Sequence, residues 1–91
     1  MIWNVITLGK EYLGTRRAGQ VLIYLPGLFE GWCAKIPDKL VRDIDDDVFT
    51  VALKDDFTIY IEKIEIDGDG NYITTNKSSI KAETFRSLFQ Q

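Results

Sequence analysis

The sequence predicts a mainly β fold of the α+β class: a small curled antiparallel sheet, or half-barrel, of about six strands with one C-terminal helix. Short segments rich in β-branched and aromatic residues alternate with turn residues along most of the chain. Apolar residues at helical spacing occur only near the C-terminus. The alternation also shifts phase once, near Glu62 and Lys63, where a β-bulge would bend the sheet. A flat sheet with the helix across one face is the alternative architecture.

The first three strands are expected at residues 2–8, 20–25 and 31–37. The second of these, QVLIYL, is a continuous apolar run of the kind found in strands that are covered on both faces. The third alternates until Pro37 and forms a hairpin with the second through the loop PGLFEG. Residues 10–19 contain two glycines and are expected to form a loop.

Residues 38–42 fit either a helical turn or an edge strand, and the pattern does not decide between them. The aspartate-rich segment that follows is expected to be a turn, because aspartate side chains bond to nearby backbone groups. Apolar residues then alternate over 49–53 and again over 57–61, around an Asp-Asp turn. This pattern predicts the clearest hairpin in the chain.

The last elements are a tight turn over 67–71, a short strand over 72–75 and a helix over 80–89. Glycines in the segment DGDGN favour the turn, because they accept positive φ. Ser78 or Ser79 would cap the helix, whose apolar stripe has to pack on the sheet.

The composition is that of one ordinary globular domain spanning residues 1–91. The chain is 45% hydrophobic and 27% charged, with a formal net charge of −3. Residues 1–42 carry a net charge of +3 and residues 43–91 a net charge of −6. Such asymmetry can steer a charged partner or drive head-to-tail self-association.

Cysteine use and hydropathy indicate a cytoplasmic protein. Cys33 is the single cysteine, so no internal disulfide can form. No secretory signal is visible, and no apolar run reaches the length of a membrane span. We therefore expect no membrane association, and a bacterial host cytosol if the gene belongs to a phage.

The sequence offers no catalytic residues and predicts a protein that is not an enzyme. It contains no histidine, the usual general base near neutral pH and the commonest metal ligand. It has no phosphate-binding glycine loop and no zinc-ligand spacing. Cys33 lies in a predicted strand without a histidine to activate its thiol. No cofactor is expected.

The segment 65–76 resembles only the first half of a calcium-binding EF-hand loop. Acidic residues alternate up to Gly70 at the sixth position, but the twelfth is Asn76 where a bidentate glutamate is needed. A plain hairpin turn is the better interpretation, and no metal site is predicted.

We expect the chain to bind a protein partner. Leu28 and Phe29 place apolar side chains at a hairpin tip, where they form either an anchor for a partner or a plug for the chain's own core. The two aspartate-rich turns could gather into an acidic surface, although hydrated turns are the simpler interpretation. The candidate protein-binding residues are Leu28, Phe29, Glu30, Asp45, Asp46, Asp47, Asp55 and Asp56.

The predicted function is a small non-enzymatic protein-binding module: an inhibitor, immunity-type or assembly protein of a phage or mobile element. The alternative is a small β-barrel nucleic-acid-binding protein, which would use Trp3, Tyr12, Arg16 and Arg17 for stacking and phosphate contacts. The net charge of −3 argues against this alternative, because such modules are usually basic.

Overall fold

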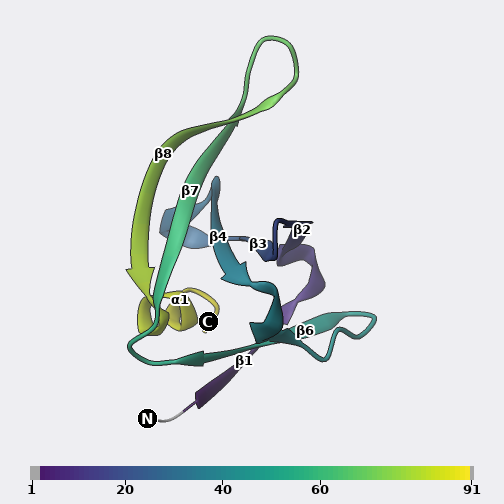
Figure 1. The fold of residues 1–91 in the computed structure, drawn as a ribbon, viewed down its shortest axis with the longest axis vertical. Helices are drawn as coiled ribbons and strands as arrows, with labels where there is room; N and C mark the ends of the chain where they lie inside the picture. Colours follow the sequence, from purple (N-terminus) through teal and green to yellow (C-terminus); the bar gives the residue numbers. More distant parts are fainter. Residues whose placement is uncertain (1–2, 91) are drawn as a thin grey trace.

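The computed structural model describes residues 3–90 and confirms the predicted fold class (Figure 1). Within these residues, eight strands form two antiparallel sheets that do not close into a barrel. Helix α1 (Ala82–Leu88) follows the last strand. Three short 3-10 helices connect strands: η1 (Lys10–Tyr12), η2 (Gly27–Phe29) and η3 (Asp38–Leu40).

The smaller sheet contains three strands in the order β1, β6, β5. These strands are β1 (Trp3–Gly9), β6 (Val48–Lys54) and β5 (Val41–Arg42). Residues 38–42, which the sequence left undecided, therefore form a helical turn followed by a two-residue edge strand. Alternate side chains of β1 and β6 are buried, as period-two alternation requires: Ile6 and Leu8 in β1, and Phe49, Val51 and Leu53 in β6.

The larger sheet contains five antiparallel strands. In their order across the sheet they are β2 (Leu13–Arg17), β3 (Gln20–Tyr24), β4 (Trp32–Pro37), β7 (Thr58–Ile66) and β8 (Tyr72–Lys81). The hairpin of β3 and β4 through the PGLFEG loop is confirmed by their pairing.

Residues 13–17 form strand β2 and not the predicted loop, because they pair with β3. Gly14, which favoured a loop, lies close to the backbone of the neighbouring strand. A Cβ atom at this position would lie 2.6 Å from the carbonyl oxygen of Leu22. Gly14 therefore permits a close approach of two strands and does not end one.

The predicted hairpin between residues 49–53 and 57–61 is wrong. These segments belong to β6 and β7, which lie in different sheets: β6 pairs with β1 and β5, whereas β7 pairs with β4 and β8. The turn between them does form, and the Phe57 N–H donates to the Lys54 carbonyl. Alternation identifies a strand and its faces, but it does not identify the partner strand.

The β7–β8 hairpin is longer than predicted and projects beyond the rest of the molecule (Figure 1). Its pairing with β7 keeps Ser78 and Ser79 in a strand, so the helix begins only at Ala82. The predicted irregularity is present as a register shift between Lys63 and Ile64. The extra residue, however, is Thr75 of β8 and not a residue near Glu62 and Lys63 in β7.

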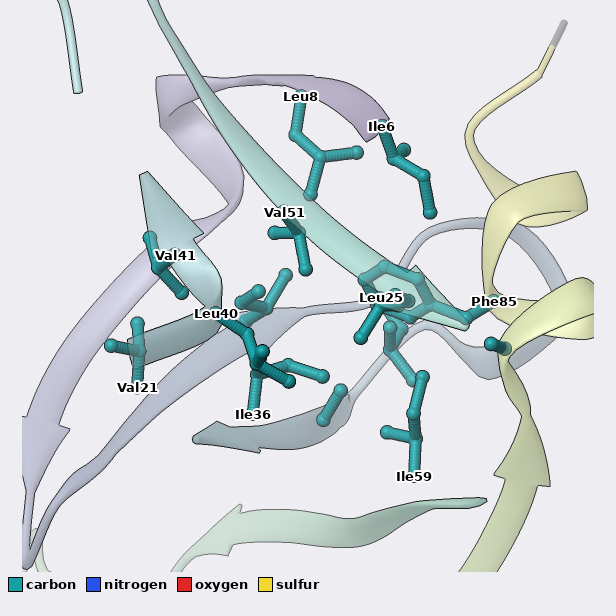
Figure 2. Close-up of a cluster of buried hydrophobic side chains, with 14 of the residues drawn as sticks. Ile6, Leu8, Val21, Leu25, Ile36, Leu40, Val41, Val51, Ile59 and Phe85 are labelled. Carbon is teal, nitrogen blue, oxygen red and sulfur yellow. The ribbon is translucent and has the colours of Figure 1, made fainter. Parts of the chain in front are cut away.

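One hydrophobic core lies between the two sheets and beneath the helix. Figure 2 shows Ile6 and Val51 of the small sheet, Ile36 and Ile59 of the large sheet and Phe85 of α1 around a common centre. The core therefore covers the inner side of the large sheet, and a partner could reach only its other side.

Candidate protein-docking face

The side of the five-stranded sheet opposite the core is here called the outer face. Pairing across the strands defines it: Tyr24 opposes Cys33, and Cys33 opposes Glu62. Because side chains alternate along a strand, every second residue from these positions points the same way. The outer face comprises Thr15, Arg17, Gln20, Leu22, Tyr24, Cys33, Lys35, Pro37, Thr58, Tyr60, Glu62, Ile64, Ile66, Tyr72, Thr74, Lys77, Ser79 and Lys81.

A buried carboxylate lies at the centre of this face. Glu62 is 6% exposed, and its Oε1 atom accepts a 2.9 Å hydrogen bond from Nζ of Lys35. Oε2 accepts a 3.2 Å hydrogen bond from the hydroxyl of Thr74 and lies 3.7 Å from a guanidinium nitrogen of Arg17. The hydrogen bond from Lys35 is the main cause that lowers the pKa of Glu62, so this carboxylate is ionised at neutral pH.

Cys33 lies opposite Glu62 and is buried. Burial is the main cause that raises the pKa of its thiol, and the negative charge of Glu62 adds to the shift. Because the reactive form of cysteine is the thiolate, this environment disfavours nucleophilic chemistry at Cys33.

A shallow hollow of about 180 Å³ opens beside the Glu62 cluster. Its apolar lining includes Leu22, Cys33 and Ile64, and aromatic and cationic side chains stand around them. The lining residues are Thr15, Arg17, Leu22, Tyr24, Cys33, Ile64 and Tyr72. The hollow can therefore accept an apolar side chain of a partner, with an acidic group of that partner next to Arg17.

Several large side chains on the outer face are exposed. Tyr24 is 48% exposed, Tyr60 and Ile66 are each 64% exposed, and Tyr72 is 75% exposed. With roughly 200 Å² for a whole aromatic side chain, the three tyrosines leave about 370 Å² uncovered. A standard protein interface buries about 800 Å² on each partner, so these tyrosines could supply nearly half of one.

The outer face is positively charged, although the whole chain is acidic. Four cationic residues point to this side: Arg17, Lys35, Lys77 and Lys81. Glu62 is the one carboxylate among the outer-face residues defined above. The formal charge of this face is therefore +3, against −3 for the chain.

The two apolar residues at the tip of the PGLFEG loop, Leu28 and Phe29, differ in exposure. Leu28 is 95% exposed, whereas Phe29 packs against the core edge-to-face with Trp32, with ring centroids 6.3 Å apart. Glu30 is exposed beside them. Gly27 adopts φ of 65° and Gly31 φ of 90°, which lets the loop turn Phe29 inward.

The two acidic turns lie at opposite ends of β6 and do not form one surface. Asp45, Asp46 and Asp47 precede this strand, and Asp55 and Asp56 follow it, so about 26 Å of extended chain separates the groups. The Asp55 carboxylate also accepts a hydrogen bond from the side chain of Asn4 and lies 3.6 Å from Arg86. Asp55 thus connects parts of its own chain.

The predicted nucleic-acid-binding residues are likewise dispersed. Trp3 lies in the small sheet, and Nζ of Lys54 lies 5.0 Å from the centroid of its ring. Tyr12 packs edge-to-face on Phe89, with ring centroids 5.1 Å apart. Arg16 pairs with Asp38, and Arg17 alone of the four reaches the outer face.

The DGDGN segment forms a hairpin turn in which Asp67 bonds to its own backbone. Oδ1 of Asp67 accepts hydrogen bonds from the backbone N–H groups of Asp69 and Asn71, both at 2.9 Å. Gly70 supplies the positive φ, at 82°. This turn carries the projecting end of the β7–β8 hairpin.

Sequence reasoning missed Tyr24, Tyr60, Tyr72 and Glu62 as site residues. The available signal was the second phase of the alternation in β7, where residues 60, 62, 64 and 66 share a face. This change of phase marks a second, semi-apolar face of β7 and not an extra residue in that strand.

Comparison of the chain with protein-family models, with curated proteins and with solved structures finds no match. Across residues 3–90, no helix combines the length and the hydropathy that crossing a membrane requires.

Proposed function

We propose that this chain is a small non-enzymatic module that binds a protein partner through the outer face of its five-stranded sheet. One observation carries the proposal: an apolar hollow lined by exposed Tyr24 and Tyr72 lies on the positively charged face of an acidic protein, and exposed Tyr60 lies on the same face. Tyrosine and arginine are enriched in protein interfaces and dominate their binding energy.

The Glu62 cluster supports this role by fixing the floor of the face. Its hydrogen bonds connect β4, β7 and β8, and the contact with Arg17 extends it to β2. A rigid floor lowers the entropic cost of binding, because fewer side chains have to be ordered when a partner arrives. An inhibitor, immunity-type or assembly protein of a phage or mobile element, acting in the cytoplasm, would need only such a surface.

Single-stranded nucleic acid is the second candidate ligand, because cations and tyrosines share the face. The overall charge of −3 opposes binding of a polyanion that extends beyond this face. Binding to a labelled oligonucleotide with a steep dependence on salt would favour this second candidate.

Affinity capture from the cell that produces the protein tests the proposal. The wild-type chain is compared with the double variant Tyr60→Ala and Tyr72→Ala. A matched control, Trp3→Ala with Val5→Ala, removes comparable exposed side chains from the small sheet. We expect the Tyr60 and Tyr72 variant to lose a protein that the control retains. Equal capture by both variants, with both folded by circular dichroism, would overturn the proposed face.

A further inference from the structure

We propose that the free edge of β8 accepts an extended acidic segment of the partner as a sixth strand of the large sheet. The inference rests on the proposed function and names the chemistry of the partner. Three features of β8 carry it: an open edge, the direction of its backbone groups and the placement of its charges.

The edge of β8 is open. This strand is last in the order of the sheet and pairs with β7 alone among the described elements. Residues 72–79 are all exposed. Unpaired N–H and C=O groups of such a strand can pair with an extended segment of another protein.

The pairing with β7 shows which backbone groups are free. The N–H of Ala82 donates to the carbonyl of Phe57 at 2.9 Å, in continuation of the register of the two strands. In an antiparallel pair, residues alternate between those that bond to the neighbour and those that face away from it. Lys77, Ser79 and Lys81 therefore direct their backbone groups to the open edge.

The bulge defines how far a regular sixth strand can extend. Thr75 interrupts the register, so residues 76–81 form the uninterrupted part of β8. Six residues equal the length of an ordinary strand. This stretch contains all three residues whose backbone groups face the edge.

The charges of β8 select an acidic segment. Lys77 and Lys81 are its only charged residues, and both lie on the outer face, opposite Glu62 and Thr58 of β7. Nζ of Lys81 donates a 3.0 Å hydrogen bond to Thr58, which holds its charge on that side. A partner strand with two carboxylates four residues apart would place both of them across from these lysines.

A second copy of this chain lacks that complement. The sheet edges within residues 3–90 are formed by β1, β2, β5 and β8, with the sequences WNVITLG, LGTRR, VR and YITTNKSSIK. None of them contains a carboxylate, and three of them are basic. Edge-to-edge pairing of two copies would oppose like charges or leave the lysines without partners.

Peptide titration followed by amide NMR tests the inference. The probe is the blocked nonapeptide TVEVTVEVT, whose glutamates are four residues apart on one face, and the matched control is TVKVTVKVT. We expect saturable shifts and slowed hydrogen exchange at the amides of Lys77, Ser79 and Lys81, with about tenfold weaker binding of the lysine peptide. The double variant Lys77→Glu and Lys81→Glu should reverse this preference.

Four results would overturn the inference: no saturable shifts at millimolar peptide, equal binding of both peptides, shifts confined to the hollow, or tighter binding of an oligothymidylate to the same amides. Capture experiments separate this failure from failure of the proposed function. If Lys77→Glu with Lys81→Glu still captures the protein that the Tyr60 and Tyr72 variant loses, the docking face stands and the sixth strand does not.

Discussion

The two faces of the five-stranded sheet are formed by the same strands but differ in their surroundings: one packs in the core and the other contains an open hollow. On the inner face, Ile23, Ala34 and Ile61 are buried among the small sheet and the helix. On the outer face, Leu22 and Cys33 are also buried, but they line a hollow beside the ionised Glu62, and its other lining residues include exposed Tyr24 and Tyr72. Low exposure therefore indicates a structural core on one face and the floor of a surface hollow on the other.

The contrast appears most directly in β7, where two isoleucines three residues apart face opposite sides. Ile61 is buried in the core, whereas Ile64 lies half-buried in the lining of the hollow. Ile61→Ala should lower the free energy of unfolding by about 3 kcal/mol, because it leaves a cavity in a closed core. Ile64→Ala should cost about 1 kcal/mol, because its site is already open to water. Urea denaturation of both variants measures the difference, and equal losses would contradict the assignment of the faces.

Substitution of Glu62 is expected to have an intermediate effect on stability, and this effect should depend on pH. Its pKa is lowered in the folded chain, so its contribution to stability is complete above the usual glutamate pKa of about 4.3 and is lost as pH falls toward the lower folded value. Glu62→Gln should reduce stability by about 1 to 2 kcal/mol at neutral pH. The difference from wild type should shrink below about pH 4.

Urea denaturation between neutral and acidic pH measures this convergence. Glu65→Gln is a suitable control, because Glu65 lies on the same strand and is exposed. A constant difference between wild type and Glu62→Gln across the whole pH range would contradict the ionised, hydrogen-bonded state of Glu62.

The smallest difference in stability is expected between two variants of the PGLFEG loop. Phe29→Ala should lower stability by about 1 to 2 kcal/mol, because Phe29 is half-buried against Trp32 and the core. Leu28→Ala should change stability by less than about 0.5 kcal/mol, because its side chain is exposed. Thermal unfolding of the two variants measures this, and equal shifts would show that Phe29 does not act as a plug.

The sequence predicted the class of fold because alternation and turn residues are local signals. It predicted the PGLFEG hairpin and an irregularity near Lys63 for the same reason, although the extra residue lies in β8 and not in β7. It did not predict that β6 and β7 separate into two sheets, since partner choice depends on how the core closes. The helix start was misplaced because pairing of residues 78–81 with β7 overrides the capping signal of two serines.

The candidate site was harder to predict than the fold, because its residues are distant in sequence. Arg17, Lys35, Glu62 and Thr74 come from four strands and meet only through sheet register. Leu28, one of the predicted residues, is exposed as an anchor requires, whereas Phe29 packs on the core. The packing of Phe29 fits a plug, whereas an anchor role for Leu28 stays a prediction.

Covalent labelling of the four tyrosines tests the central claim, that the outer face is open in the isolated protein. Tyr24, Tyr60 and Tyr72 lie on that face, whereas Tyr12 is half-buried against Phe89 and serves as the internal control. Brief hydroxyl-radical exposure followed by mass spectrometry should modify Tyr60 and Tyr72 fastest and Tyr12 slowest. Protection of Tyr60 and Tyr72 in the isolated, monomeric chain would contradict the account.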